Sequence, residues 1–157
     1  MRLGTRARYA VMAMVDLACN CHGSPVCLAE IAERQEISLC YLEQIFAKLR
    51  RAGLVTSARD PGGGYRLARS RDDIRICDII LAADEPIQAV RCTPGTAIGC
   101  RGDRSRCLTH DLWEELSNQI HLYLSSVSLA DVCEKRVLAT SGLVQREAYR
   151  VATAAAK

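Results

Sequence analysis

Residues 28–67 read LAEIAERQEISLCYLEQIFAKLRRAGLVTSARDPGGGYRL. Apolar spacing predicts a short helix over 27–34 and a second helix over 38–52 that Ser38 caps. Short β-branched runs predict two strands, over 54–57 and 65–67. Gly53 follows the second helix, where a left-handed residue commonly ends a helix. A helix, a tight turn, a helix and a two-stranded hairpin, in this order, make up the winged helix-turn-helix, which binds DNA.

The flanking sequence predicts a mainly α protein. We expect a helix over 5–20 with Thr5 as its N-cap, a short helix over 76–83 and a long helix starting near Thr109. Ser128 begins a further short helix with Asp131 at the capping-box position. We therefore expect a winged helix-turn-helix domain over 1–83 and a ligand-bearing loop over 84–110. A dimerisation helix with a short following helix is expected over 111–136, and a mobile tail over 137–157.

Base-reading residues are expected near the start of the second helix of the motif, which enters the major groove. The candidates for DNA contact are Ser38, Cys40, Tyr41, Glu43, Gln44, Arg50 at the helix end, and Arg59 in the wing. Glutamine pairs with adenine, and glutamate accepts a hydrogen bond from the cytosine amino group. An acid close to phosphates weakens affinity, so Glu43 is interpreted as a discriminator of sequence. The alternatives are a helical hairpin with a charged outer face and an ordinary exposed arginine in the wing.

Composition and charge fit a DNA-binding protein of the cytoplasm. Of 157 residues, 49% are apolar, which is enough for a packed core. No apolar run approaches the roughly 18 residues that a membrane span needs, and no export signal is recognisable. Residues 1–75 carry 12 basic and 8 acidic side chains, whereas residues 76–157 carry 9 and 10. The basic first half favours a nucleic-acid partner.

Nine cysteines are many for this length, and the odd number argues against a disulfide framework. Five of them lie among apolar residues of the predicted elements, where free cysteine packs as a small hydrophobe: Cys19, Cys27, Cys40, Cys77 and Cys133.

Three cysteines and a histidine form a candidate metal centre in a glycine-rich stretch: Cys92, Cys100, Cys107 and His110. The spacing C-x7-C-x6-C-x2-H lacks the tight C-x2-C knuckle usual for structural zinc, and so favours an iron–sulfur cluster. A zinc-stabilised module, a metal-free thiol switch and a thiol enzyme using Cys107 with His110 remain alternatives.

A heptad seam runs along the long helix through Trp113, Leu116, Ile120, Tyr123 and Val127. We expect it to form a symmetric homodimer, because palindromic operators require two reading heads. Packing of this seam on the winged domain of the same chain is the alternative.

Several stretches resemble the winged-helix family of cluster- and thiol-sensing bacterial transcription regulators, in particular its iron–sulfur cluster regulators: 1–3, 8–11, 37–38, 41–44, 49–50, 53–55, 61–65 and 91–110. The resemblance implies a homodimeric regulator, chiefly a repressor, that is not an enzyme and binds an imperfect palindrome in double-stranded DNA. It also implies one [2Fe–2S] cluster per subunit on Cys92, Cys100, Cys107 and His110, supplied by the assembly machinery whose genes it controls. Relatives that sense nitric oxide, iron or thiol oxidation are the alternative.

Two departures from the family's pattern stand out. The gaps between the cysteines are longer, and Cys40 stands where a serine is usual. We expect the 92–110 loop to lie between the dimer helix and the winged domain, so that cluster insertion changes the placement of the reading heads.

Overall fold

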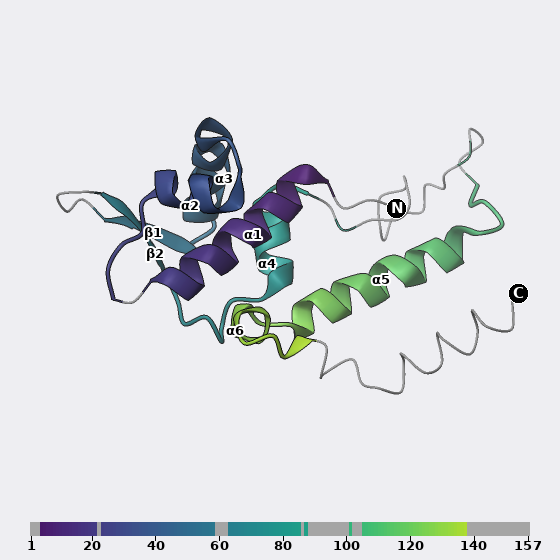
Figure 1. Ribbon diagram of the computed structural model, residues 1–157. Coiled ribbons are helices and arrows are strands. Elements are labelled where there is room, and N and C mark those ends of the chain that lie inside the picture. Colours follow the sequence, from purple (N-terminus) through teal and green to yellow (C-terminus); the bar gives the residue numbers. More distant parts are fainter. Residues whose placement is uncertain are drawn as a thin grey trace, which may run out of the picture.

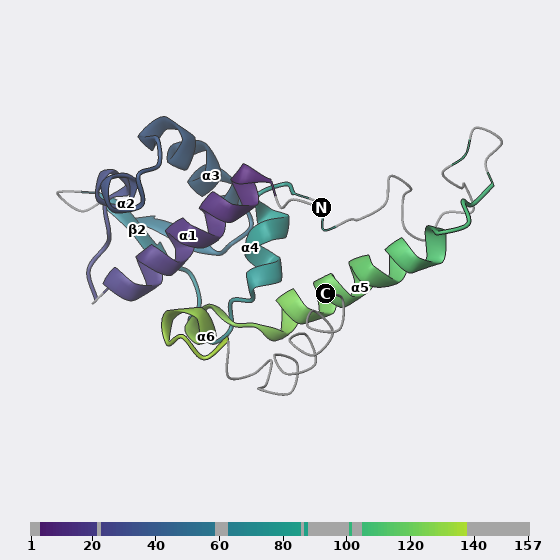
Figure 2. The same cartoon turned by 45° about the vertical axis from the view of Figure 1, so that its right-hand side comes forward.

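The computed structural model describes residues 4–21, 23–58, 63–85, 87, 101 and 105–137. These residues form six helices and two strands: α1 (Thr5–Asn20), α2 (Leu28–Gln35), α3 (Leu39–Arg51), β1 (Val55–Ala58), β2 (Gly64–Leu67), α4 (Ile76–Ala82), α5 (His110–Ser126) and α6 (Leu129–Cys133). Helices α1 to α4, α6 and the hairpin form one body, from which α5 projects (Figures 1 and 2). The predicted mainly α, winged helix-turn-helix fold is confirmed.

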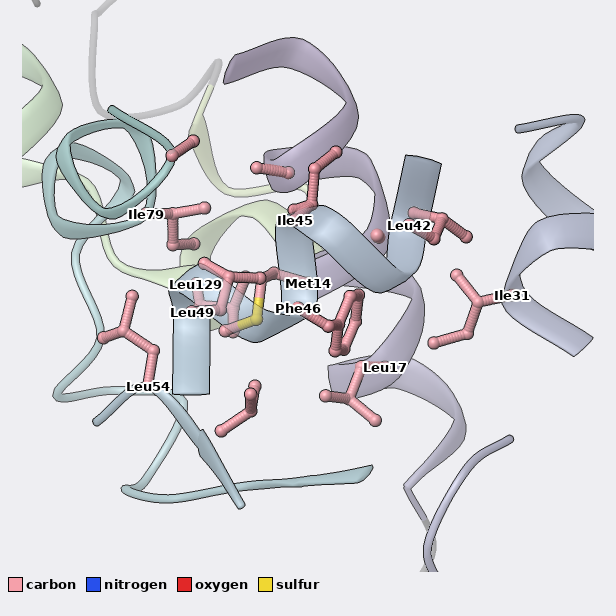
Figure 3. Close-up of a cluster of buried hydrophobic side chains, with 14 of the residues drawn as sticks. Met14, Leu17, Ile31, Leu42, Ile45, Phe46, Leu49, Leu54, Ile79 and Leu129 are labelled. Atoms are coloured by element: carbon pink, nitrogen blue, oxygen red, sulfur yellow. The ribbon is translucent and has the colours of Figure 1, made fainter. Parts of the chain in front are cut away.

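Helix α1 lies at the centre of this body and contacts α2, α3, α4 and α6. It can be surrounded because three of its buried positions are alanines, which let neighbouring backbones approach closely: Ala7, Ala10 and Ala13. Larger side chains from all of these helices fill the remaining space (Figure 3), among them Met14, Leu17, Ile31, Leu42, Phe46, Ile79 and Leu129.

The wing is held against the body by a third extended segment. Strands β1 and β2 pair antiparallel, and Tyr65 of β2 exchanges two backbone hydrogen bonds with Val26, of 2.8 and 3.0 Å. Gly64 has φ +137°, and a Cβ atom there would lie 2.8 Å from the Val26 carbonyl oxygen, so the close approach requires glycine. The Tyr65 ring packs on Phe46 of α3 at a centroid distance of 4.9 Å. The wing and α3 are thereby fixed to each other.

A buried carboxylate joins α1 to α2. Asp16 of α1 is 6% exposed. Its oxygens accept hydrogen bonds from Arg34 Nη2 at 2.6 Å, Gln35 Nε2 at 2.8 Å and Asn20 Nδ2 at 3.2 Å. Burial alone would raise the pKa of Asp16, but the hydrogen bonds from Arg34 and Gln35 and the charge of Arg34 outweigh it and lower the pKa. The carboxylate therefore stays ionised in the folded protein at neutral pH.

Helix α5 is tied to the body at its C-terminal end. Ile76, which begins α4, donates its backbone N–H to the Val127 carbonyl at 3.0 Å. Ser128 and Asp131 form the predicted capping box of α6: the Ser128 hydroxyl accepts from the Asp131 N–H at 3.1 Å, and the Asp131 carboxylate accepts from the Ser128 N–H at 3.0 Å. The C-terminus of α5 is thus fixed between α4 and α6.

Val127 differs from its predicted role on the dimer face. It follows the last residue of α5, has an extended backbone and is 8% exposed within the core of its own chain. The heptad pattern did not predict the burial of Val127, because α5 ends at Ser126 and the helical repeat does not determine where the side chain of the next residue points.

Two helix starts also differ from the expectation. Gly4, not Thr5, is the N-cap of α1, and the Glu85 carboxylate accepts a hydrogen bond from the Ala7 N–H at 3.3 Å. Ser38 is the N-cap of α3 but makes no side-chain capping hydrogen bond. The predicted left-handed residue after α3 is confirmed, with φ +69° at Gly53.

The cysteines predicted to be small core residues divide into two groups. Cys77 is buried, and Cys27 and Cys133 are partly buried, but Cys19 and Cys40 are exposed. Cys40 lies on the solvent side of α3, and Cys19 lies at the exposed edge of the contact between α1 and α6, so apolar neighbours in sequence did not predict their burial.

We predict that Asp16→Ala lowers the free energy of unfolding by roughly 2 kcal/mol, because it removes the hydrogen bonds from three side chains and leaves the half-buried Arg34 charge with only the exposed Glu30 at 3.8 Å. Since the pKa of Asp16 is lower in the folded state, its contribution is present above the unfolded pKa near 3.9 and is lost as the pH falls through the folded pKa. Urea denaturation at pH 7 and at decreasing pH measures both effects.

Glu30→Ala is the matched control, because Glu30 also faces Arg34, at 3.8 Å, but is exposed. Its effect should stay within about 0.5 kcal/mol. Equal losses in the two variants would contradict a special role for the buried carboxylate.

Candidate nucleic-acid interface and metal centre

Helix α3 presents one face to the core and the other to solvent. Leu42, Ile45, Phe46 and Leu49 are buried. The predicted DNA-contact residues on the other side are exposed: Ser38, Cys40, Glu43, Gln44 and Arg50. This face carries a carboxylate, an amide and a guanidinium, which together supply hydrogen-bond donors and acceptors for base edges and phosphates.

Tyr41, another predicted DNA contact, is only partly exposed. Its ring packs edge-to-face on Tyr9 of α1, with centroids 5.9 Å apart and planes at 83°. The contact fixes α3 against α1 and leaves the tyrosine beside the exposed side chains of α3. Arg59, the predicted wing contact, lies outside the described residues.

Basic residues near α3 include one that the sequence reasoning missed. Arg6 of α1 lines a small cleft with Tyr41, Gln44, Ile45 and Lys48. Lys48 is bound to Asp84 at 2.7 Å, and this hydrogen bond together with the Lys48 charge lowers the pKa of Asp84. In the sequence, Arg6 stood out only as one of the basic residues at the start of the chain. The packing of α1 on α3 places it beside the exposed side chains of α3.

Two of the four predicted metal ligands are described, and they lie one helical turn apart. His110 is the first residue of α5, and its backbone N–H donates to the Cys107 carbonyl at 3.0 Å. The Cys107 sulfur lies 3.8 Å from the Thr109 hydroxyl. His110 is 4% exposed and Cys107 is partly exposed. Cys92 and Cys100 lie outside the described residues.

The surroundings of His110 are polar and charged. Its Nε2 lies 3.6 Å from a Glu114 carboxylate oxygen, and Arg106 lies 3.6 Å from Asp111 and 3.9 Å from Glu114. Donor atoms of His110, Asp111 and Glu114 all lie within 4.8 Å of one another. A carboxylate beside an imidazole is the usual partner that orients a metal-binding histidine. The donor atoms that lie together in the described residues are therefore those of His110, Asp111 and Glu114, and the Cys107 thiol, although one turn away in sequence, is not among them.

An apolar stripe runs along the solvent side of α5. Leu112, Trp113, Leu116 and Tyr123 are exposed, with Leu112 at 62%, and Ile120 is half-buried. On another side of α5, His121 Nδ1 lies 3.4 Å from the Cys77 sulfur of α4. The stripe is thus separate from the side that contacts the body. Within the described residues, no helix has the length and apolar character of a membrane span.

The His110 end of α5 is the end farther from the winged body, whereas the Ser126 end adjoins α4 and α6 (Figures 1 and 2). Within one chain, Cys107 and His110 therefore lie away from the winged domain, whereas the expected place of the 92–110 loop between a dimer helix and a winged domain stays a prediction. The reason is that α5 is one uninterrupted helix of 17 residues that separates its two ends.

Comparisons with known proteins agree with this architecture. The Rrf2 family, described as iron-dependent transcriptional regulators, matches residues 3–135. The HTH-type transcriptional regulator IscR of Photorhabdus laumondii is 49% identical over 143 residues, which cover 90% of this chain and 85% of that protein.

Two solved structures show the same fold. The IscR of T. potens is 37% identical with a TM-score of 0.69, and the match covers 87% of this chain and 88% of that one. CymR, the global cysteine regulator of B. subtilis, is 30% identical with a TM-score of 0.71, and the match covers 86% and 98%. The chain therefore belongs to the Rrf2 family of winged-helix transcriptional regulators and is a regulator rather than an enzyme.

Proposed function

We propose that this protein is a homodimeric, DNA-binding repressor that senses iron–sulfur cluster status and controls genes of cluster assembly. The observation that carries the proposal is the shielded His110, one turn from Cys107, at the start of a helix whose other end is fixed to the winged domain. The similarity to IscR proteins and the family's description as iron-dependent regulators support it.

The proposed ligands of a [2Fe–2S] cluster, one per subunit, are Cys92, Cys100, Cys107 and His110. The cluster would supply a redox-active and labile centre whose presence reports the cell's capacity to build such clusters. Arg106 lies beside Asp111 and Glu114 and offsets part of their negative charge near the ligands. Glu114 beside His110 Nε2 would orient the imidazole for binding. The cluster-assembly machinery is the proposed source.

The proposed dimer forms through the apolar stripe of α5, namely Leu112, Trp113, Leu116, Ile120 and Tyr123. Burial of such side chains against a second copy is favourable by about 25 cal/mol per Å² of apolar surface. In an antiparallel pair, the His110 end of one α5 lies beside the Ser126 end of the other. Each ligand set would then lie near the junction of the partner's α5 with its winged domain, which gives the centre a route to the DNA-reading helix.

The proposed DNA contacts are the exposed side chains of α3, together with Arg59 in the wing. Gln44 and Glu43 would read bases, and Arg50 would contact the phosphate backbone. A dimer would present two copies of α3 to an imperfect palindrome. We place the protein in the cytoplasm, where this DNA lies.

Thiol sensing without a cluster is the second candidate, and the likeness to CymR favours it. In that case Cys107 would be the sensing group at the start of α5, and His110 would be its neighbour rather than a ligand.

We predict that protein purified without oxygen holds about two iron and two sulfide per chain and absorbs visible light, and that His110→Ala loses most of both. Iron and sulfide assays with an absorption spectrum measure this. His121→Ala, on the same helix and outside the ligand set, is the control and should retain the iron. Colourless wild-type protein with stoichiometric zinc, or with no metal, would contradict the cluster.

We predict that Gln44→Ala weakens binding to an operator, selected from random DNA by the wild type, by roughly tenfold or more, because one base contact is worth about 1–3 kcal/mol. Glu43→Ala should relax sequence preference without weakening binding to unrelated DNA, since it removes a negative charge. Fluorescence anisotropy at several salt concentrations gives both quantities. Glu33→Ala, an exposed acid on α2, is the control. Unchanged affinities in both α3 variants would show that α3 does not read the operator.

We predict that Tyr123→Glu on the stripe converts a dimer into a monomer at micromolar concentration, because it places a charge in an apolar interface. Leu122→Glu is a matched control, since Leu122 is 60% exposed but lies off the stripe. Sedimentation equilibrium distinguishes the two masses. The stripe is not the interface if both variants remain dimeric, or if both dissociate equally.

A further inference from the structure

Two cysteines that are far apart in sequence lie against each other at the contact between α1 and α6. Cys19 is in the last turn of α1 and is exposed, and Cys133 is the last residue of α6 and is partly buried. The Cys19 thiol contributes to the raised pKa of the neighbouring Cys133. The Cys133 sulfur also lies 4.0 Å from the carbonyl oxygen of Val15, one helical turn before Cys19. The contact thus involves both the thiols and the helix backbone beneath them.

The two thiols differ in environment. Burial raises the pKa of Cys133 to about 12, with further contributions from the hydrogen bond to Cys19 and from the charge that Cys19 carries when ionised. Cys133 therefore keeps its proton at neutral pH. Cys19 lines an open pocket of about 420 Å³ together with Arg66 and Arg71. Arg71 is bound to Glu134 at 2.9 Å, so the accessibility of the Cys19 sulfur in this pocket, rather than a free positive charge, is what lets an oxidant reach it.

Two other cysteines near the end of α1 could compete with Cys133 as a disulfide partner of Cys19, but each has a different position or hydrogen-bond partner. Cys21 lines the same pocket, but its sulfur donates to the Ser24 carbonyl at 3.3 Å. Cys27 is the N-cap of α2. In the described residues the geometry therefore selects Cys133 as the partner of Cys19.

We propose that Cys19 and Cys133 form a reversible disulfide, a redox modification site separate from the candidate metal centre. With hydrogen peroxide as oxidant, the Cys19 thiolate attacks one peroxide oxygen, the O–O bond breaks, and Cys19 becomes a sulfenic acid while water leaves after protonation. The Cys133 thiol then attacks the Cys19 sulfur, the S–O bond breaks, and the Cys133 proton passes to the departing hydroxide. The S–S bond forms with release of a second water. Two thiols are oxidised and one peroxide is reduced, and a dithiol reductant reverses the step.

The bond would lock the junction between the winged body and the long helix. Helix α6 follows α5 after only Val127 and Ser128, and α1 is the central helix of the body. A covalent link between α1 and α6 closes a long loop of chain, which restricts the unfolded state and raises the midpoint of thermal unfolding. The inference does not depend on cluster binding, because neither cysteine belongs to the ligand set.

The test treats the full-length protein with hydrogen peroxide, alkylates the remaining thiols and maps linked peptides. Trypsin with a glutamate-specific protease separates Cys133 from Cys107, because Glu114 and Glu115 lie between them. We expect a reducible peptide pair with two hydrogens fewer than the free thiols, and its fragment spectra should place the bridge between Cys19 and Cys133, because Cys19, Cys21 and Cys27 stay in one peptide. The thermal midpoint should rise on oxidation and return with dithiothreitol.

Cys21→Ser is the matched control and should keep the linked pair and the rise in midpoint. Cys133→Ser should lose both and leave Cys19 as sulfenic acid, which a dimedone probe traps; this readout also shows that Cys19 is still accessible. Linkage of Cys19 to Cys21, or two freely alkylated thiols after oxidation, would overturn the proposal. A linked pair without a rise in midpoint would refute the locking of the junction.

Discussion

The ionised Asp16 carboxylate inside the body constrains how the first three helices meet. An unpaired buried carboxylate would be costly, so α2 must bring Arg34 and Gln35 against α1. The turn after α2 is tight, with Glu36 in the left-handed conformation at φ 54°, and α3 begins three residues later. The orientation of α2 therefore sets the side of α3 that faces solvent. The position of α3 in turn fixes the wing, because Tyr65 of β2 packs on Phe46 of α3 and pairs with Val26.

Under the proposed function, helix α5 would separate the part of the protein that reads DNA from the part that senses. Its C-terminal end is fixed by Val127 and by the α6 capping box, while His110 lies at the other end. A rigid helix keeps the two ends apart within one chain. A dimer resolves this separation, because an antiparallel partner would bring each sensing end to a DNA-reading body. The proposed disulfide acts at the fixed end of the same helix, so two independent chemistries would converge on one junction.

Much of the fold followed from local patterns. The apolar periods of α2 and α3, Gly53 and the Ser128–Asp131 capping box are set by nearby residues, and all were predictable. Val127 and the exposure of Cys19 and Cys40 were not, because they depend on where a helix ends and which side meets its neighbours. The role of Asp16 was also missed, since its partners come from a different helix. Of the candidate site, the sequence predicted that α5 begins beside Cys107 and His110, but not how far that end lies from the winged body within one chain, because this depends on the packing of α5.

The central claim is that the ligand set at the far end of α5 controls DNA reading by α3. It is tested most directly by measuring the affinity of one protein preparation for a set of selected operators, with the cluster present and after its anaerobic removal. The account predicts that at least one operator class changes affinity by about tenfold, a typical allosteric coupling, while binding to unrelated DNA stays the same. Equal affinity of both forms for every operator would contradict it.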